Sequence, residues 1–125
     1  MKKILVVDDE LCTMRALYRI LKLEGFEISA SSSVDEGIAT IEMLNNTCDQ
    51  LDLIIADIQM PGKTGMDLLL KVKEFYPGLP VIIITGYGSP QIERIFRETG
   101  CVDFIYKPFS PEELITSIKK VFNNN

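Results

Sequence analysis

The chain has 125 residues, of which 46% are hydrophobic and 25% charged, and its net charge is −5. This length predicts one domain over residues 1–125, long enough to bury about two thirds of its unfolded surface. The negative charge argues against direct nucleic-acid contact by this chain. The sequence has neither an apolar stretch of membrane-spanning length nor a signal-peptide core, so we expect no membrane association and a cytoplasmic location.

Histidine and cysteine usage narrows the chemistry. The sequence contains no histidine, which excludes Ser–His and Cys–His nucleophilic machinery, His-ligated zinc and a histidine phosphodonor within this chain. Cys12, Cys48 and Cys101 are far apart and form no C-x-x-C pair. We expect Cys12 and Cys101 to be small packing residues.

The first part of the chain reads as two strand–helix pairs. Apolar runs predict strands at about 3–7 and 26–30. The helical spacing of apolar residues between them predicts a helix over about 11–24, which Gly25 ends. A second helix begins at Ser33, where a Ser-x-x-Glu pattern indicates a capping box.

The rest of the chain continues the alternation. A third helix follows Gly65, a fourth begins at Ser89 and ends at Gly100, and a fifth begins at Ser110. We expect Ile95 of the fourth helix to face inward. The remaining strands are predicted at about 52–57, 80–85 and 102–106.

Short, continuously apolar strands that alternate with amphipathic helices indicate a parallel sheet covered on both faces. We therefore predict an α/β fold, with five parallel strands in a doubly wound sheet of order 2-1-3-4-5. In such sheets, ligands bind beyond the carboxyl ends of the strands, at the point where the strand order reverses.

Charged and polar residues follow the strands at that edge. Asp8 and Asp9 come after the first strand, Asp57 ends the third, Thr85 ends the fourth and Lys107 follows the fifth. Oxygen ligands on an open site suit Mg²⁺, and the lysine and metal together would balance the three carboxylates. Without metal, at least one carboxyl pKa should rise. A carboxylate there could attack phosphorus to form an acyl phosphate.

Each of these residues also has an ordinary structural interpretation. Paired aspartates are often turn or helix-cap residues, as Asp57 could be. Thr85 could be a simple β-branched strand residue and Lys107 a solvated charge. These interpretations weaken together, because all five side chains fall at carboxyl ends of strands.

Four segments together resemble the receiver (CheY-like) domain of bacterial two-component response regulators. They are Ile4-Leu-Val-Val-Asp-Asp-Glu10, Ile54-Ile-Ala-Asp-Ile-Gln-Met-Pro-Gly62, Ile82-Ile-Ile-Thr-Gly-Tyr-Gly-Ser89 and Asp103-Phe-Ile-Tyr-Lys-Pro-Phe109. The resemblance spans the whole chain and implies the flavodoxin-like (βα)₅ fold. It also implies a cis peptide between Lys107 and Pro108.

The resemblance assigns roles to individual residues. Asp57 is the implied phosphoryl acceptor, and Lys107 contacts the phosphoryl group. Asp8, Asp9, Asp57 and the backbone carbonyl of Gln59 are the implied Mg²⁺ ligands. Thr85 is the implied switch hydroxyl, and an aromatic residue that turns inward with it falls on Phe104.

The implied function is a signalling switch without enzymatic activity beyond its own phosphorylation and dephosphorylation at Asp57. A sensor histidine kinase or phosphotransfer protein supplies the phosphoryl group, and Mg²⁺ assists. Phosphorylation then alters the surface of the fourth helix, fifth strand and fifth helix. A downstream output domain or protein reads that surface, and the phosphorylated chain could form a homodimer.

Two other classes of protein match the sequence less well. A Mg²⁺-dependent aspartyl-phosphate hydrolase would normally offer a general acid two residues beyond the nucleophile, but that position is Gln59. An FMN-binding electron carrier needs a phosphate loop after its first strand, where Asp8 and Asp9 would repel phosphate. A colourless purified protein would exclude the second.

Overall fold

The computed structural model of the protein describes residues 1–48 and 50–123 and contains one parallel five-stranded sheet of order β2-β1-β3-β4-β5. This confirms the predicted fold and strand order. The strands are β1 (Lys3–Val7), β2 (Glu27–Ser31), β3 (Leu53–Ala56), β4 (Val81–Thr85) and β5 (Asp103–Tyr106). The helices are α1 (Leu11–Leu23), α2 (Val34–Asn45), α3 (Gly65–Phe75), α4 (Pro90–Thr99) and α5 (Pro111–Asn123).

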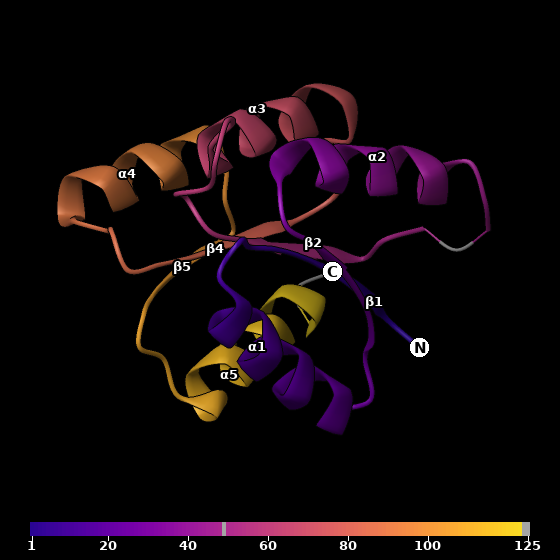
Figure 1. Ribbon diagram of the computed structural model, residues 1–125, viewed down its shortest axis with the longest axis horizontal. Helices are drawn as coiled ribbons and strands as arrows, with labels where there is room; N and C mark the ends of the chain where they lie inside the picture. Colours follow the sequence, from indigo (N-terminus) through magenta and orange to yellow (C-terminus); the bar gives the residue numbers. More distant parts are fainter. Residues whose placement is uncertain (49, 124–125) are drawn as a thin grey trace.

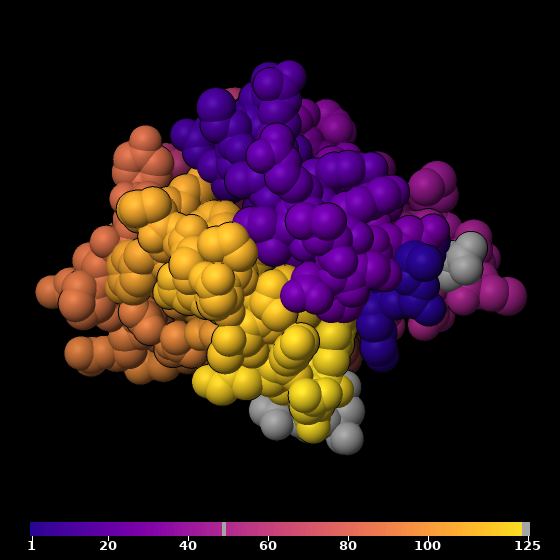
Figure 2. Space-filling model, turned by 90° about the horizontal axis from the view of Figure 1, so that it is seen from below, coloured from indigo at the N-terminus to yellow at the C-terminus, as the bar shows by residue number. Residues whose placement is uncertain are grey.

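The sheet separates two layers of helices. Helices α2, α3 and α4 lie on one face, and α1 and α5 cover the other (Figure 1). Figure 2 shows α1 and α5 side by side over that second face. Alternate residues of each strand serve the two layers: Leu5 and Val7 of β1 pack with the α2–α4 core, whereas Ile4 and Val6 pack with the α1–α5 core.

Local hydrogen bonds explain where several helices begin and end. The Thr64 side chain accepts a hydrogen bond from the Asp67 backbone N–H, and the Asp67 carboxylate accepts one from the Thr64 backbone N–H. These two bonds make a capping box at the start of α3. The Ser89 hydroxyl accepts from the Ile92 N–H at 3.2 Å, and Pro90 starts α4. Gly100 ends α4 with φ 119°, a left-handed conformation that favours glycine. These local signals fix where α3 and α4 begin and where α4 ends.

The structure corrects two expectations about side chains. Ile95 is 53% exposed rather than inward-facing, because α4 lies at the sheet edge over β5 and Phe96 makes its buried contact. Cys12 is exposed on α1, whereas Cys101 is buried as expected. Burial raises the pKa of the Cys101 thiol to about 11, which suits a packing role.

Among the helices of residues 1–48 and 50–123, none has the length and apolar character needed to cross a membrane. The peptide between Lys107 and Pro108 is cis, as expected.

Candidate functional site

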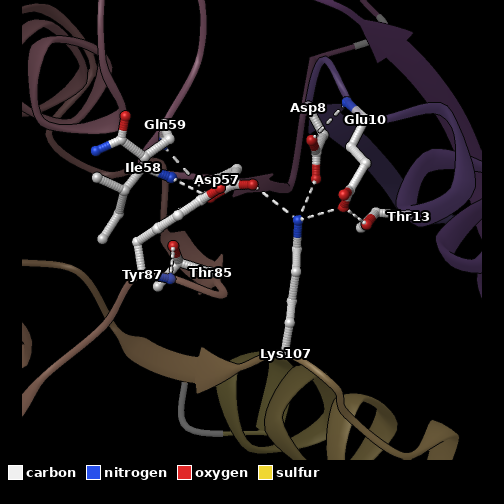
Figure 3. A network of polar contacts seen from close by, with 9 residues as sticks. All are labelled: Asp8, Glu10, Thr13, Asp57, Ile58, Gln59, Thr85, Tyr87 and Lys107. Carbon is white, nitrogen blue, oxygen red and sulfur yellow. Dashed lines mark hydrogen bonds and ion pairs between the residues drawn. The ribbon is translucent and has the colours of Figure 1, made fainter.

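Three of the predicted site residues meet at the carboxyl edge of the sheet. The Lys107 Nζ lies 2.7 Å from Asp57 Oδ2 and 3.1 Å from Asp8 Oδ2, as Figure 3 shows. Both carboxylates are buried, with Asp8 3% and Asp57 5% exposed. Buried charged groups need partners. The lysine therefore serves as the counter-ion of the site.

Strand pairing explains why residues so far apart in sequence converge. Val7 of β1 is the register partner of Ala56 of β3, so the aspartates that follow them lie side by side. The Asp57 N–H donates to the Val7 carbonyl at 3.1 Å, which extends this pairing into the site. On the other side, the Lys107 N–H donates to the Thr85 carbonyl at 2.8 Å. Backbone hydrogen bonds thus fix the main-chain positions of Asp57 and Lys107.

The two oxygens of Asp57 have different surroundings. Oδ1 accepts a 2.6 Å hydrogen bond from the Ile58 backbone N–H, whereas Oδ2 accepts from the Lys107 ammonium. The backbone therefore orients the carboxylate through Oδ1, and Oδ2 is the oxygen that lies beside the lysine. A carboxylate held in this way can act as a nucleophile toward an electrophilic phosphorus atom.

Burial and ion pairing shift the pKa values of two residues in the cluster. Burial is the main cause of a raised Asp8 pKa, while the bond from the Glu10 backbone N–H and the Lys107 ammonium act in the opposite direction. This confirms the expectation of a raised carboxyl pKa, although repulsion by Asp57 is a minor cause. Burial would lower the Lys107 pKa, but hydrogen bonds to Asp57 and Asp8 outweigh it and raise the pKa. Lys107 is therefore fully charged at neutral pH.

The predicted metal ligands lie around one opening. Asp9, Asp57, Gln59 and Lys107 line a cavity of about 1170 Å³ beside the buried Asp8. The oxygen atoms of Asp9, Asp57 and Gln59 fit the chemistry of Mg²⁺. Within residues 1–48 and 50–123, however, no group of three acidic, cysteine or histidine side chains surrounds a point that could hold an ion. As the side chains lie, the Lys107 ammonium supplies the positive charge between Asp8 and Asp57.

The two predicted switch residues are both buried. Thr85 is 0% exposed, and its hydroxyl oxygen accepts a 3.0 Å hydrogen bond from the Tyr87 backbone N–H. Phe104 is 5% exposed. Its ring lies between those of Phe96 and Tyr106, with centroids 5.8 and 5.4 Å away. Phe104 is thus already inward in this structure, and its movement on phosphorylation stays a prediction.

The structure adds a residue that sequence reasoning missed. Glu10 Oε1 lies 3.1 Å from the Lys107 Nζ, and Thr13 donates its hydroxyl to the same carboxylate oxygen. The sequence signal was the acidic residue directly after Asp8 and Asp9. That signal alone does not reveal whether such a side chain turns toward the site or toward solvent.

A buried pair of aspartates bridged by a lysine, on a doubly wound (βα)₅ sheet, defines a class of α/β proteins with an acidic site at the strand ends. A model of the response regulator receiver domain matches residues 4–119. The chain therefore belongs to the response regulator receiver domain family.

Individual relatives agree with this assignment. The C4-dicarboxylate transport transcriptional regulatory protein DctD of Rhizobium meliloti is 32% identical over 117 residues, which cover 94% of this chain and 24% of DctD. A CheY-like receiver domain protein from Methanospirillum hungatei is 31% identical with a TM-score of 0.89, covering 99% of this chain and 95% of that one.

A third relative was solved with ligands. A CheX–CheY–BeF3–Mg²⁺ complex from Borrelia burgdorferi contains a chain that is 27% identical to this one, with a TM-score of 0.89. The match covers 97% of this chain and 89% of that one. The present chain spans between about a quarter and just over half of the length of the curated relatives that it matches.

Proposed function

We propose that the chain is a phosphoryl-accepting signalling switch in which Asp57 takes a phosphoryl group from a phosphohistidine of a partner protein. The observation that carries this proposal is the arrangement of Asp57: the Ile58 N–H fixes one oxygen, and the other accepts a hydrogen bond from Lys107, with both residues lining an open cavity. The donor is a sensor histidine kinase or a phosphotransfer protein. The absence of histidine from this chain fits a donor in a separate protein or domain.

The transfer exchanges one bond for another. Asp57 Oδ2 attacks the phosphorus, the bond from phosphorus to the donor imidazole nitrogen breaks, and the electron pair leaves with the imidazole. Lys107 then donates a hydrogen bond to a phosphoryl oxygen and stabilises the charge that develops there. Mg²⁺, when held by Asp8, Asp9, Asp57 and the Gln59 carbonyl, would supply further positive charge at the same oxygens.

The readout of phosphorylation begins at Thr85. Its hydroxyl lies at the carboxyl end of β4 and bonds the Tyr87 N–H. A phosphoryl group on Asp57 offers that hydroxyl a stronger, charged acceptor. We infer that Thr85 then turns toward the phosphoryl group and that Phe104 shifts with it.

This movement alters the surface of α4, β5 and α5. That surface carries exposed apolar side chains, with Ile95 and Tyr106 53% and 38% exposed. Exposed apolar groups of this kind mark contact surfaces. We infer that an output domain or protein, or a second phosphorylated copy of the chain, binds there.

Intact-protein mass spectrometry tests the acceptor. The protein is incubated with acetyl phosphate and Mg²⁺, beside Asp57→Asn and a metal-free sample. One added phosphoryl group in the wild type, absent from Asp57→Asn and without metal, is the expected result. An adduct that persists in Asp57→Asn would contradict the assignment, and rapid release of free phosphate without any adduct would favour a hydrolase.

A further inference from the structure

Glu10 takes part in the site although it is neither of the paired aspartates. Its carboxylate accepts a hydrogen bond from the Lys107 ammonium at 3.1 Å, the same distance as the bond from Lys107 to Asp8 (Figure 3). The carboxylate lies at the solvent side of the cluster, where its side chain is 59% exposed. Exposed ion pairs are usually loose. The pair between Glu10 and Lys107 has a second hydrogen bond that fixes the carboxylate.

The second hold on Glu10 comes from α1. Thr13 donates its hydroxyl to Glu10 Oε1, the same atom that accepts from Lys107. Glu10 occupies the N-cap position of α1, yet within the described residues its side chain makes no capping hydrogen bond. Its carboxylate bonds the Thr13 hydroxyl and the Lys107 ammonium and does not bond a backbone N–H of the helix start. The position therefore gives up the usual stabilisation of a helix start.

Glu10 is one of three carboxylates that surround the Lys107 ammonium. A lysine ammonium carries three N–H donors. In this structure Asp57, Asp8 and Glu10 each accept one of them. With two of the donors held by Asp8 and Glu10, the third points at Asp57 Oδ2, the oxygen that we propose as nucleophile.

We propose that Glu10, held by Thr13, is a positioning residue for phosphoryl transfer: it orients the Lys107 ammonium toward the oxygen of Asp57 that receives the phosphoryl group. This inference rests on the proposed function and concerns the same site. Glu10 acts through Lys107 and does not itself contact the reacting atoms.

A simple charge effect makes a different prediction. The carboxylate of Glu10 adds negative charge beside a site that must admit an anionic donor. If charge alone mattered, Glu10→Ala and Glu10→Gln would accelerate phosphorylation equally. If Glu10 positions the lysine, both variants slow the reaction, and Glu10→Gln less so, because its amide oxygen still accepts from Lys107 and Thr13.

The test measures phosphorylation of the full chain by acetyl phosphate with Mg²⁺ over a range of donor concentrations. We expect Glu10→Ala to lower the saturating rate constant about five-fold and Glu10→Gln about two-fold, the range of an exposed ion pair. The half-saturating donor concentration should not rise. Glu24→Gln, which removes one charge from the exposed far end of α1, is the matched control and should resemble the wild type.

A double-mutant cycle and a spectroscopic measurement complete the test. In a Lys107→Met background, adding Glu10→Ala should change nothing, because the group that Glu10 positions is gone. Nitrogen NMR of the unphosphorylated protein should show the Lys107 ammonium signal shifted by Glu10→Ala and unmoved by Glu24→Gln. This second readout needs neither phosphoryl transfer nor metal.

The outcomes separate this inference from the proposed function. Wild-type protein that takes no phosphoryl group would contradict the proposed function, and the NMR shift would still decide whether Glu10 holds Lys107. Wild-type protein that is phosphorylated, with Glu10→Ala equal or faster, would overturn the positioning role. An effect of Glu10→Ala that persists in Lys107→Met would overturn it as well.

Discussion

Two networks in this molecule are each centred on one cation, and they differ in burial and in how many carboxylates that cation binds. At the strand ends, Lys107 binds the three carboxylates of Asp8, Glu10 and Asp57. On the α4–β5 face, Arg97 binds Glu93 at 2.8 Å and Asp103 at 2.9 Å. The first network sets one cation against three carboxylates in a partly buried place, whereas the second sets one cation against two carboxylates and lies nearer the surface.

The carboxyl pKa values record this difference. Burial raises the pKa of Asp8. Burial also acts to raise the pKa of Asp103, but hydrogen bonds from the Ser117 hydroxyl, the Phe104 N–H and Arg97 outweigh it and lower the pKa. The Asp8 anion is therefore unfavourable in the fold, and the Asp103 anion is favourable. Ionised Asp103 in the α4–β5 network therefore stabilises the fold, whereas ionised Asp8 in the strand-end network costs the fold free energy.

The largest expected effect concerns the backbone beneath the strand-end network. A Cβ on Gly65 would lie 2.4 Å from the Asp57 carbonyl oxygen, and backbone cannot move aside. We expect Gly65→Ala to lower the free energy of unfolding by about 3 kcal/mol. Gly78, where a Cβ would meet nothing within 4 Å, is the control. Urea denaturation of both variants checks this, and equal midpoints would contradict it.

The next test removes each cation in turn. Lys107→Met leaves Asp8 and Asp57 buried without their counter-ion, so we expect a loss of about 2 kcal/mol in the free energy of unfolding without metal. Arg97→Met breaks more exposed pairs and should cost less than about 1 kcal/mol. Denaturation in metal-free buffer measures both. A larger loss for Arg97→Met would contradict the argument that burial of Asp8 and Asp57 makes their counter-ion the more important of the two cations.

The third test uses pH. Asp8 has a raised pKa, so its contribution favours the fold below its unfolded pKa of about 3.8 and is lost as the pH rises through the folded value. We therefore expect Asp8→Asn to raise the free energy of unfolding at pH 7 by about 1 kcal/mol. The melting temperature, followed from pH 3 to 7, should gain most at the upper end.

Asp103 should behave in the opposite way. Its lowered pKa gives a stabilisation that is present above the unfolded value of about 3.8 and is lost as the pH falls through the folded value. Asp103→Asn should thus lower the melting temperature at pH 7 and show a smaller further loss in acid than the wild type. If both aspartate variants shift stability in the same direction at pH 7, the contrast between the networks fails.

The smallest expected effect is at the edge of the α4–β5 network. The Tyr106 hydroxyl donates a 2.7 Å hydrogen bond to Glu93 at the surface. Tyr106→Phe removes that bond but keeps the ring contact with Phe104, so the melting temperature should fall by about 1 °C. Calorimetry of Tyr106→Phe beside Tyr87→Phe, which lies outside this network, measures the difference. An equal change in both variants would show that the bond to Glu93 contributes nothing.

Sequence reasoning worked where the physical signal is local or follows from topology. Continuous apolar runs located β1, β3 and β4 within about one residue at each end, because a buried parallel strand needs apolar side chains on both faces. The convergence of Asp8, Asp57 and Lys107 followed from parallel strands sharing one carboxyl edge. The capping residues Ser89 and Gly100 marked the ends of α4 as expected.

The rest depends on contacts that a linear pattern does not contain. Ile95 has helical spacing with Phe96 and Ile92, but its exposure depends on how little of α4 the sheet edge covers. The place of Glu10 depends on the path of the Lys107 side chain across the site. The bond from Tyr106 to Glu93 depends on how α4 is seated on β5. Each requires the relative placement of elements that are distant in sequence.

The alternation of β5 has a consequence for how partners influence one another. Phe104 packs into the α2–α4 layer, and Ile105, two residues before Lys107, packs into the α1–α5 layer. A displacement of this strand would therefore change packing contacts on both faces of the sheet at once. Two proteins bound on opposite faces would be linked thermodynamically, and each would change the affinity of the other by the same factor. If the output protein and the phosphohistidine donor proposed above bind on opposite faces, binding of the first would also change the affinity of the chain for the second.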